Sequence, residues 1–239
     1  MHLILFDIDG TLLNADGAGR AAMVRTLDAF VGHHDALDGF AFGGKLDWTI
    51  WRALLAAEGY SAAEVDAQLP QLYRRYVAEL VFLLSAPNGP RPRPLPGVVA
   101  LLSALERRAD VQLALVTGNA EAGAWLKLAR AGLQRFFHVG AFGNEALERT
   151  ALPPLAVRRA EAWWGQRFDP AQITVVGDTA NDIASARPLG ARTVAVATGS
   201  ATAAALHQHA ADAVLPDFTA LDRTLAALGL GSGPLAVER

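Results

Sequence analysis

Short apolar runs alternate with helix-like segments along most of this 239-residue chain. The runs cover residues 3–6, 111–116, 137–141, 173–176, 193–197 and 213–215, and the helical patterns between and after the later ones cover residues 97–108, 120–131, 153–165, 181–189, 201–209 and 218–228. Strands that are apolar along their whole length are typical of a parallel sheet with helices on both faces. The chain is therefore predicted to be an α/β protein with a doubly wound parallel sheet.

A block of helices interrupts this alternation after the first strand. Apolar residues recur at spacings of three and four over residues 20–32, 47–58, 62–68 and 70–85, and no strand-like run separates them. The proline- and glycine-rich stretch 87–94 that follows has the composition of a linker. We therefore predict a core formed by residues 1–16 and 88–239, with a smaller all-helical domain, residues 17–87, inserted into it.

Composition excludes several classes of protein. Hydrophobic residues make up 52% of the chain and charged residues 19%, as in ordinary globular proteins, and the formal net charge of −3 gives no basic surface for nucleic acid or an anionic membrane. The chain has no cysteine, so disulfides and thiolate sites are excluded. Neither a signal peptide nor an apolar segment of membrane-spanning length is present, which predicts a cytoplasmic protein.

Two acids follow the first strand. Asp7 and Asp9 stand two residues apart, so both side chains project to the same side, and Gly10 and Thr11 turn the chain away. In a doubly wound sheet the ligand crevice lies at the carboxyl ends of the strands. This pair is therefore predicted to provide a nucleophile, a proton shuttle and ligands for a divalent cation.

Two further acids follow the strand 173–176. Asp178 comes at the strand end and Asp182 one helical turn later on the same side, although either could simply cap the following helix. Like charges about 4 Å apart repel by about 4 kcal/mol at an effective dielectric constant near 20, so protons or a cation must relieve a cluster of four carboxylates. Carboxylate oxygens with open water positions suit Mg²⁺, which we predict as the cofactor.

Thr117, Gly118 and Asn119 follow the strand 111–116. A hydroxyl group, a glycine that permits close approach and the free N–H groups of a helix start can cradle a phosphate, although Thr or Asn in this position also serves as an ordinary N-cap. Because this segment follows a strand, as Asp7 and Asp9 do, we predict that it forms a phosphate cradle.

The segment Asp7-Ile8-Asp9-Gly10-Thr11-Leu12 resembles the first signature of the haloacid dehalogenase superfamily, whose members are mostly Mg²⁺-dependent phosphatases. The downstream segments follow in the family's order, and the helical block lies where the family's first type of cap domain is inserted. The stretches 16–20, 43–47 and 117–119 are most similar to the phosphoglycolate phosphatase-like branch.

The resemblance implies a mechanism for a small phosphate ester. Asp7 attacks phosphorus to give an aspartyl-phosphate, and Asp9 protonates the leaving alkoxide and then activates water. The resemblance also implies that Asp7, the Asp9 carbonyl and Asp178 hold Mg²⁺. The phosphoryl oxygens are bound by Thr117, by the backbone of Gly118 and Asn119, and by a basic residue. Asp182 orients a metal-bound water or lies just outside the ligand sphere.

The basic residue departs from the family pattern, which has a lysine before a proline-started helix. Lys127 lies two and a half turns along the helix after Thr117, and we expect it to be solvated. Arg149 precedes such a helix and is preferred over Arg158, which lies inside it. An arginine supplies a permanent charge and bidentate contacts.

Substrate selection is expected to fall on the inserted domain. Lys45 and Arg20 are candidates for substrate contact, although Lys45 could equally be a solvated side chain and for Arg20 a surface position is the preferred interpretation. We expect a monomer or homodimer with no nucleic-acid or membrane partner. A sugar phosphomutase of the same superfamily is the alternative enzyme, and a phospho-accepting signalling module is the alternative from another class.

Overall fold

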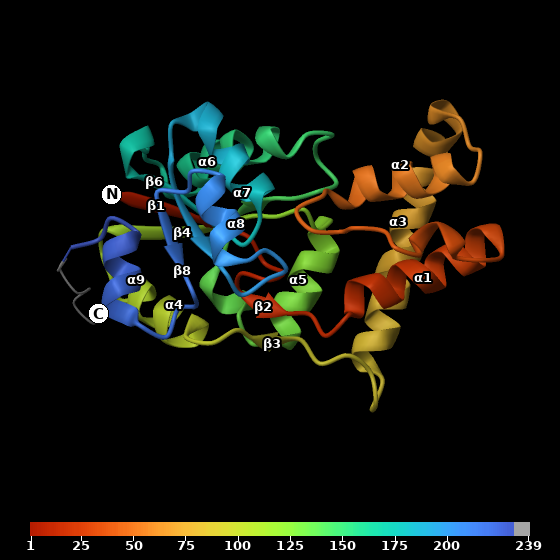
Figure 1. Cartoon of the computed structure of the whole chain (residues 1–239), viewed down its shortest axis with the longest axis horizontal. Coiled ribbons are helices and arrows are strands. Elements are labelled where there is room, and N and C mark those ends of the chain that lie inside the picture. The colour runs from red at the N-terminus through yellow and green to blue at the C-terminus, as the bar shows by residue number, and fades with distance from the viewer. Residues whose placement is uncertain (232–239) are drawn as a thin grey trace.

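The computed structural model describes residues 1–231 and contains one six-stranded parallel sheet (Figure 1). Its strands are β1 (His2–Phe6), β4 (Val111–Val116), β5 (Gly140–Ala141), β6 (Ile173–Gly177), β7 (Arg192–Val196) and β8 (Ala213–Leu215). They lie in the order β5-β4-β1-β6-β7-β8, so β1 is central and the direction of winding reverses beside it. The predicted doubly wound α/β class is confirmed. Of the apolar run 137–141, only the last two residues pair as a strand.

Helices cover both faces of this sheet, as alternation within β1 requires. Ile4 and Phe6 pack in the core beneath α4 (Val98–Glu106), α5 (Glu121–Arg130) and α9 (Leu221–Ala227). Leu3 and Leu5 pack in the opposite core, beneath α6 (Leu152–Trp164) and α7 (Ala180–Ala186), and α8 (Ala203–Gln208) packs beside α7. Five short 3₁₀ helices complete the described elements: η1 (Asp35–Leu37), η2 (Gln134–Phe136), η3 (Arg149–Ala151), η4 (Pro170–Gln172) and η5 (Arg187–Leu189).

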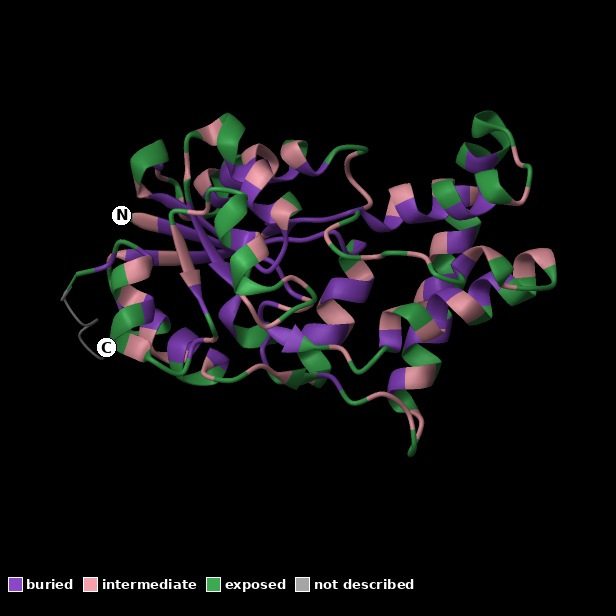
Figure 2. Cartoon of the chain, viewed as in Figure 1, coloured by how far each residue is buried: buried purple, intermediate pink, exposed green. Residues whose placement is uncertain are grey.

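The inserted block forms a separate helical unit of α1 (Ala18–Val31), α2 (Asp47–Ala57) and α3 (Ala62–Ser85), which projects from one end of the sheet (Figure 1). It has its own buried core (Figure 2). In this core Trp51 packs edge-on against Tyr76. The predicted break at Pro70 is wrong, because α3 continues through this residue. Leu69, Leu72 and Tyr76 keep a continuous apolar face buried across the proline, and this packing outweighs the lost backbone hydrogen bond.

Two short strands join the helical unit to the core. β2 (Leu13–Asn14) and β3 (Arg93–Pro94) pair antiparallel, so the chain leaves and re-enters the core side by side. The sequence predicts only linker composition here. The division into a core of 1–16 and 88–239 and an insertion of 17–87 fits this crossing and remains a prediction, and its residues 232–239 lie outside the described part of the chain. No helix among residues 1–231 is both long enough and apolar enough to cross a membrane.

Candidate active site

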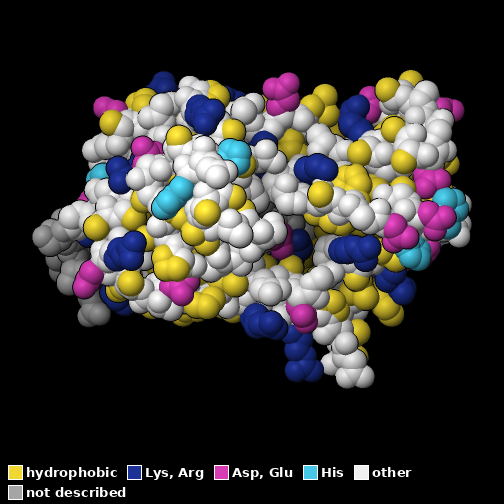
Figure 3. Space-filling model, in the orientation of Figure 1, with side chains coloured by type: hydrophobic (Ala, Val, Ile, Leu, Met, Phe, Trp, Pro, Cys, Tyr) yellow, Lys and Arg dark blue, Asp and Glu magenta, His cyan; other side chains and the backbone are white. Residues whose placement is uncertain are grey.

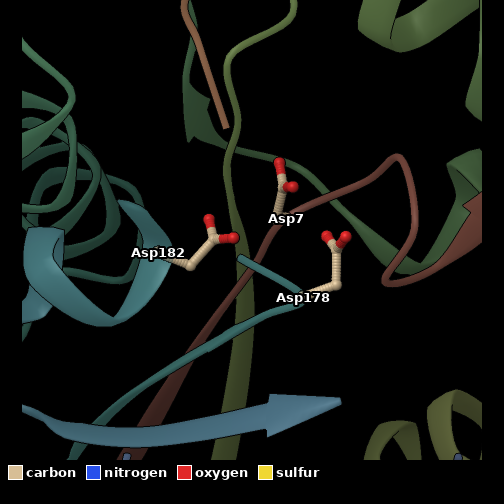
Figure 4. A group of neighbouring side chains, drawn as sticks. All are labelled: Asp7, Asp178 and Asp182. Carbon is tan, nitrogen blue, oxygen red and sulfur yellow. The ribbon is translucent and has the colours of Figure 1, made fainter. Parts of the chain in front are cut away.

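The carboxyl ends of β4, β1 and β6 bring three segments of the sequence together. Asp7 follows β1, Thr117 follows β4 and Asp178 follows β6, and these strands are direct neighbours in the sheet. One carboxylate oxygen from each of Asp7, Asp178 and Asp182 lies within 4.8 Å of the others (Figure 4). The structure thus gathers three of the four predicted acids around one point.

A tight turn after β1 makes room for this group. Gly10 has a φ of 82°, a left-handed conformation that glycine adopts without strain. A Cβ atom there would lie 2.5 Å from Asp178 Oδ2, so the position of Asp178 also requires a residue without a side chain. The Thr11 hydroxyl donates a 3.1 Å hydrogen bond to Asp178 Oδ1. The Gly-Thr pair after the acids therefore holds Asp178 against the turn.

The three buried carboxylates of Asp7, Asp178 and Asp182 carry more negative charge than Arg149 beside them neutralises. Burial and, secondarily, the charges of Asp7 and Asp182 raise the pKa of Asp178 to about 8. Burial also raises the pKa of Asp7 to about 6, against the opposing effect of the Arg149 guanidinium. Three buried oxygen donors with a single neighbouring cation fit a divalent ion that prefers oxygen ligands.

Arg149 is the cation of this group. It opens η3, is buried, and places Nη2 3.2 Å from Asp7 Oδ1 and in contact with Asp182 Oδ1. Its Nε atom is buried without a hydrogen-bond partner. Arg158 is exposed on α6 and lines a different surface hollow. The geometry therefore brings Arg149 and not Arg158 beside the nucleophile candidate.

Asp182 has two sets of partners. As the third residue of α7 it accepts hydrogen bonds from the backbone N–H and hydroxyl group of Thr179, at 2.9 and 2.6 Å, in a capping box. Its other oxygen contacts Arg149. The capping alternative considered from the sequence thus coexists with a place in the acid group.

Asp9 lies apart from the acid group and has a different set of partners. Its Oδ2 accepts hydrogen bonds from Asn119 Nδ2 at 2.6 Å and from Lys127 Nζ at 2.8 Å. Asn119 also donates to the Thr117 hydroxyl at 2.9 Å, which links this arrangement to the end of β4. The expectation that Lys127 is solvated is wrong, since only 4% of it is exposed. Lys127 lies in the middle of α5, and its long apolar stem carries the ammonium group from there to Asp9 at the end of β1.

The helical unit completes the site with the loop that precedes α2. Asp47 donates its backbone N–H to Gly118 O and accepts the Ala120 N–H on Oδ2, both at 2.8 Å. Gly44 O accepts hydrogen bonds from Arg149 and Asn181. Asp47 was not among the predicted site residues, since its partners lie more than seventy positions away and no local pattern indicates them.

A cleft of about 300 Å³ lies between the core and the helical unit, with charged side chains visible in it (Figure 3). Lys45 and Arg20 both line it and are exposed. The Lys45 ammonium lies 4.4 Å from the centre of the Phe40 ring, and Arg20 donates to Leu37 O at 3.4 Å. Both candidates for substrate contact thus reach the cleft, and neither contacts the acid group.

The fold is that of an α/β protein with a doubly wound parallel sheet, and three aspartates gather at the carboxyl ends of its central strands. A model of haloacid dehalogenase-like hydrolases matches residues 1–190, and the chain belongs to this family. It is 29% identical to the phosphoglycolate phosphatase of Synechococcus elongatus over 83% of this chain and 85% of that one. It is 27% identical to that of Agrobacterium fabrum over 93% and 91%. The chain is accordingly a phosphatase, a hydrolase of phosphoric monoesters.

Solved structures share the fold. CbbY from Rhodobacter sphaeroides, crystallised in complex with phosphate, superposes with a TM-score of 0.64 at 21% identity over 96% of this chain and 100% of that one. A predicted phosphoglycolate phosphatase from Haemophilus somnus gives a TM-score of 0.67 at 22% identity over 94% and 97%. At these identities the likeness concerns the fold alone.

Proposed function

We propose that the chain hydrolyses a small phosphate monoester through an aspartyl-phosphate on Asp7, with Mg²⁺ as its metal. The observation that carries the proposal is the position of Asp7, buried at the end of the central strand between Arg149 and Asp178. With a pKa of about 6, Asp7 is mostly ionised at neutral pH and can act as a nucleophile.

The metal is supported by the charge balance of the acid group. Asp7 and Asp178 would hold the ion, with the Asp9 carbonyl as a further ligand and Asp182 held back by Arg149 and Thr179. When bound, Mg²⁺ neutralises charge on the phosphoryl oxygens and reduces their repulsion of the nucleophile.

The reaction then needs two steps at phosphorus. An Asp7 oxygen forms a bond to phosphorus while the bond to the ester oxygen breaks, and Asp9 gives its proton to the leaving alkoxide. A water molecule next attacks phosphorus, Asp9 takes its proton, and the bond to Asp7 breaks to release phosphate. Thr117, the backbone N–H groups of Gly118 and Asn119, and Arg149 line the same cleft and are suited to bind the phosphoryl oxygens.

The substrate is proposed to be a short anionic ester of the phosphoglycolate type. Both curated relatives are phosphoglycolate phosphatases, and a cleft of about 300 Å³ suits a small molecule. The helical unit is proposed to act as a cap, because its loop at Asp47 lies against the strand ends, where a cap serves to exclude water from the reaction. Lys45 and Arg20 are the cap residues proposed to contact the substrate.

The test is phosphate release from a panel of small phosphate esters, with Mg²⁺ and with EDTA. We expect turnover only with the metal, and Asp7→Asn should abolish it while thermal unfolding stays cooperative. Many turnovers of free phosphate would also speak against a phosphomutase or a signalling module, each of which retains the phosphoryl group on substrate or protein. Appreciable hydrolysis by Asp7→Asn would refute the proposed nucleophile.

A further inference from the structure

Lys127 is a buried cation that the proposed chemistry does not use. Its ammonium group donates to Asp9 Oδ2 at 2.8 Å and to Asn119 Oδ1 at 2.6 Å, and the residue is 4% exposed. Burying an ammonium costs several kcal/mol unless it is paired. Such an arrangement therefore calls for a function or a strong structural reason.

The packing around Lys127 makes room for this arrangement. A Cβ atom on Gly19 would lie 3.2 Å from Lys127 Nζ, so the glycine in α1 leaves space for the ammonium group. The charge of Lys127 also lowers the pKa of buried Asp47, against the larger effect of burial, which raises it to about 6. Lys127 thus lies between the acid of the first strand and the loop of the helical unit.

Asp9 needs a fixed orientation to serve as the proton donor. Its side chain is 37% exposed, more than that of Asp7, so packing alone does not hold it. Lys127 and Asn119 both bind Oδ2, which leaves Oδ1 without any hydrogen bond among the described residues and free to face an ester oxygen. Asn119 is itself held by the Thr117 hydroxyl and by Lys127.

We propose that Lys127 is a positioning residue for Asp9, holding one carboxylate oxygen so that the other meets the leaving group of the phosphate ester. This inference rests on the proposed function and adds to it a residue from the middle of α5. The effect is specific: loss of Lys127 impairs proton transfer to the leaving oxygen, whereas attack by Asp7 is left in place.

Leaving groups of different basicity separate the contribution of proton transfer from that of nucleophilic attack within this step. An alkyl phosphate needs its leaving oxygen protonated, whereas p-nitrophenyl phosphate releases a weakly basic phenolate without help. In Lys127→Met we expect the first turnover of ethyl phosphate, followed by rapid quench, to slow about 100-fold, which is within the usual range for general acid catalysis. The p-nitrophenolate burst in stopped flow should slow less than about tenfold.

Two controls test whether the effect passes through Asp9. Arg130→Met removes an exposed cation one turn further along α5 and should change neither rate. In a double-mutant cycle, Lys127→Met should add less than about threefold to the loss in Asp9→Asn, because both changes remove the same step. Additive losses would overturn the proposal.

Equal losses on both esters would also overturn it, since they would indicate general disruption of the site. If Lys127→Met fails to fold, Lys127→Gln, which keeps a neutral donor, carries the same comparison of esters. The proposed function fails in a different way: the wild-type protein would then release no phosphate from these two esters or from any other member of the panel.

Discussion

The affinity for Mg²⁺ should depend steeply on pH, because the ion competes with protons for the same oxygens. Burial first, then the charges of Asp7 and Asp182, raise the pKa of Asp178 to about 8. Burial raises that of Asp7 to about 6. A divalent cation binds the ionised carboxylates, so its binding must displace whatever protons they hold.

The size of the effect follows from these values. At pH 7 Asp178 lies about one unit below its pKa of about 8, so most of it is protonated, at a cost to metal binding of about 1 kcal/mol. The apparent affinity should therefore be about tenfold weaker at pH 7 than at pH 9. Near pH 6 it should weaken about tenfold again, and a further twofold as Asp7 reaches half-protonation.

Isothermal titration calorimetry provides the assay. At pH 7, titrations in two buffers of different ionisation enthalpy should reveal about one proton released for each Mg²⁺ bound. In Asp178→Asn, affinity should drop and the dependence between pH 7 and 9 should vanish, whereas Asp217→Asn, far along the chain and only partly exposed, should bind as the wild type does. An affinity that stays constant from pH 6 to 8.5, with no proton release, would refute the electrostatic description of the site.

Three further predictions concern stability and the cation of the site. Without metal, the folded protein keeps the Asp178 proton up to about pH 8, whereas the unfolded chain loses it near pH 4. The free energy of unfolding, measured with urea, should therefore fall as pH rises between these values, and Mg²⁺ should restore this stability. Arg149→Met should lower kcat about 100-fold through the loss of the cation beside Asp7, while Arg149→Lys should retain more activity in the phosphate-release assay. Asp47→Ala removes the acceptor of the Ala120 N–H at the start of α5 and should cost about 1 kcal/mol of unfolding free energy, measured with urea, and raise KM.

The fold and the acid group could be predicted because both follow from local patterns and one topological rule. Continuous apolar runs identify buried parallel strands, and parallel strands present their carboxyl ends at one edge, so acids placed after those runs must meet. Asp7 and Asp178 are found in this way. Arg149 is preferred because the family pattern has a basic residue before a proline-started helix, and the structure puts it beside Asp7.

The contacts made by long side chains and by the helical unit could not be predicted in the same way. The environment of Lys127 depends on how α5 packs, although one signal exists: Ala120, Ala124 and Leu128 mark the buried face of the helix, and Lys127 lies on that face. Asp47 meets Ala120 only because the loop before α2 lies against the carboxyl end of β4. The path of α3 through Pro70 is likewise fixed by tertiary packing.

The two acids of the first strand can have different roles because they belong to different charge groups. Asp7 shares a buried group of three carboxylates with one guanidinium, that of Arg149, and this deficit of positive charge is what a divalent ion would relieve. Asp9, two residues on, is matched by the ammonium of Lys127 and the amide of Asn119. It therefore needs no metal at its side chain, which stays available for the proposed role as proton donor and acceptor. The spacing of the two acids directs both toward one cleft, whereas the separate cations on α5 and η3 give Asp7 and Asp9 the different surroundings that their proposed roles as nucleophile and proton donor require.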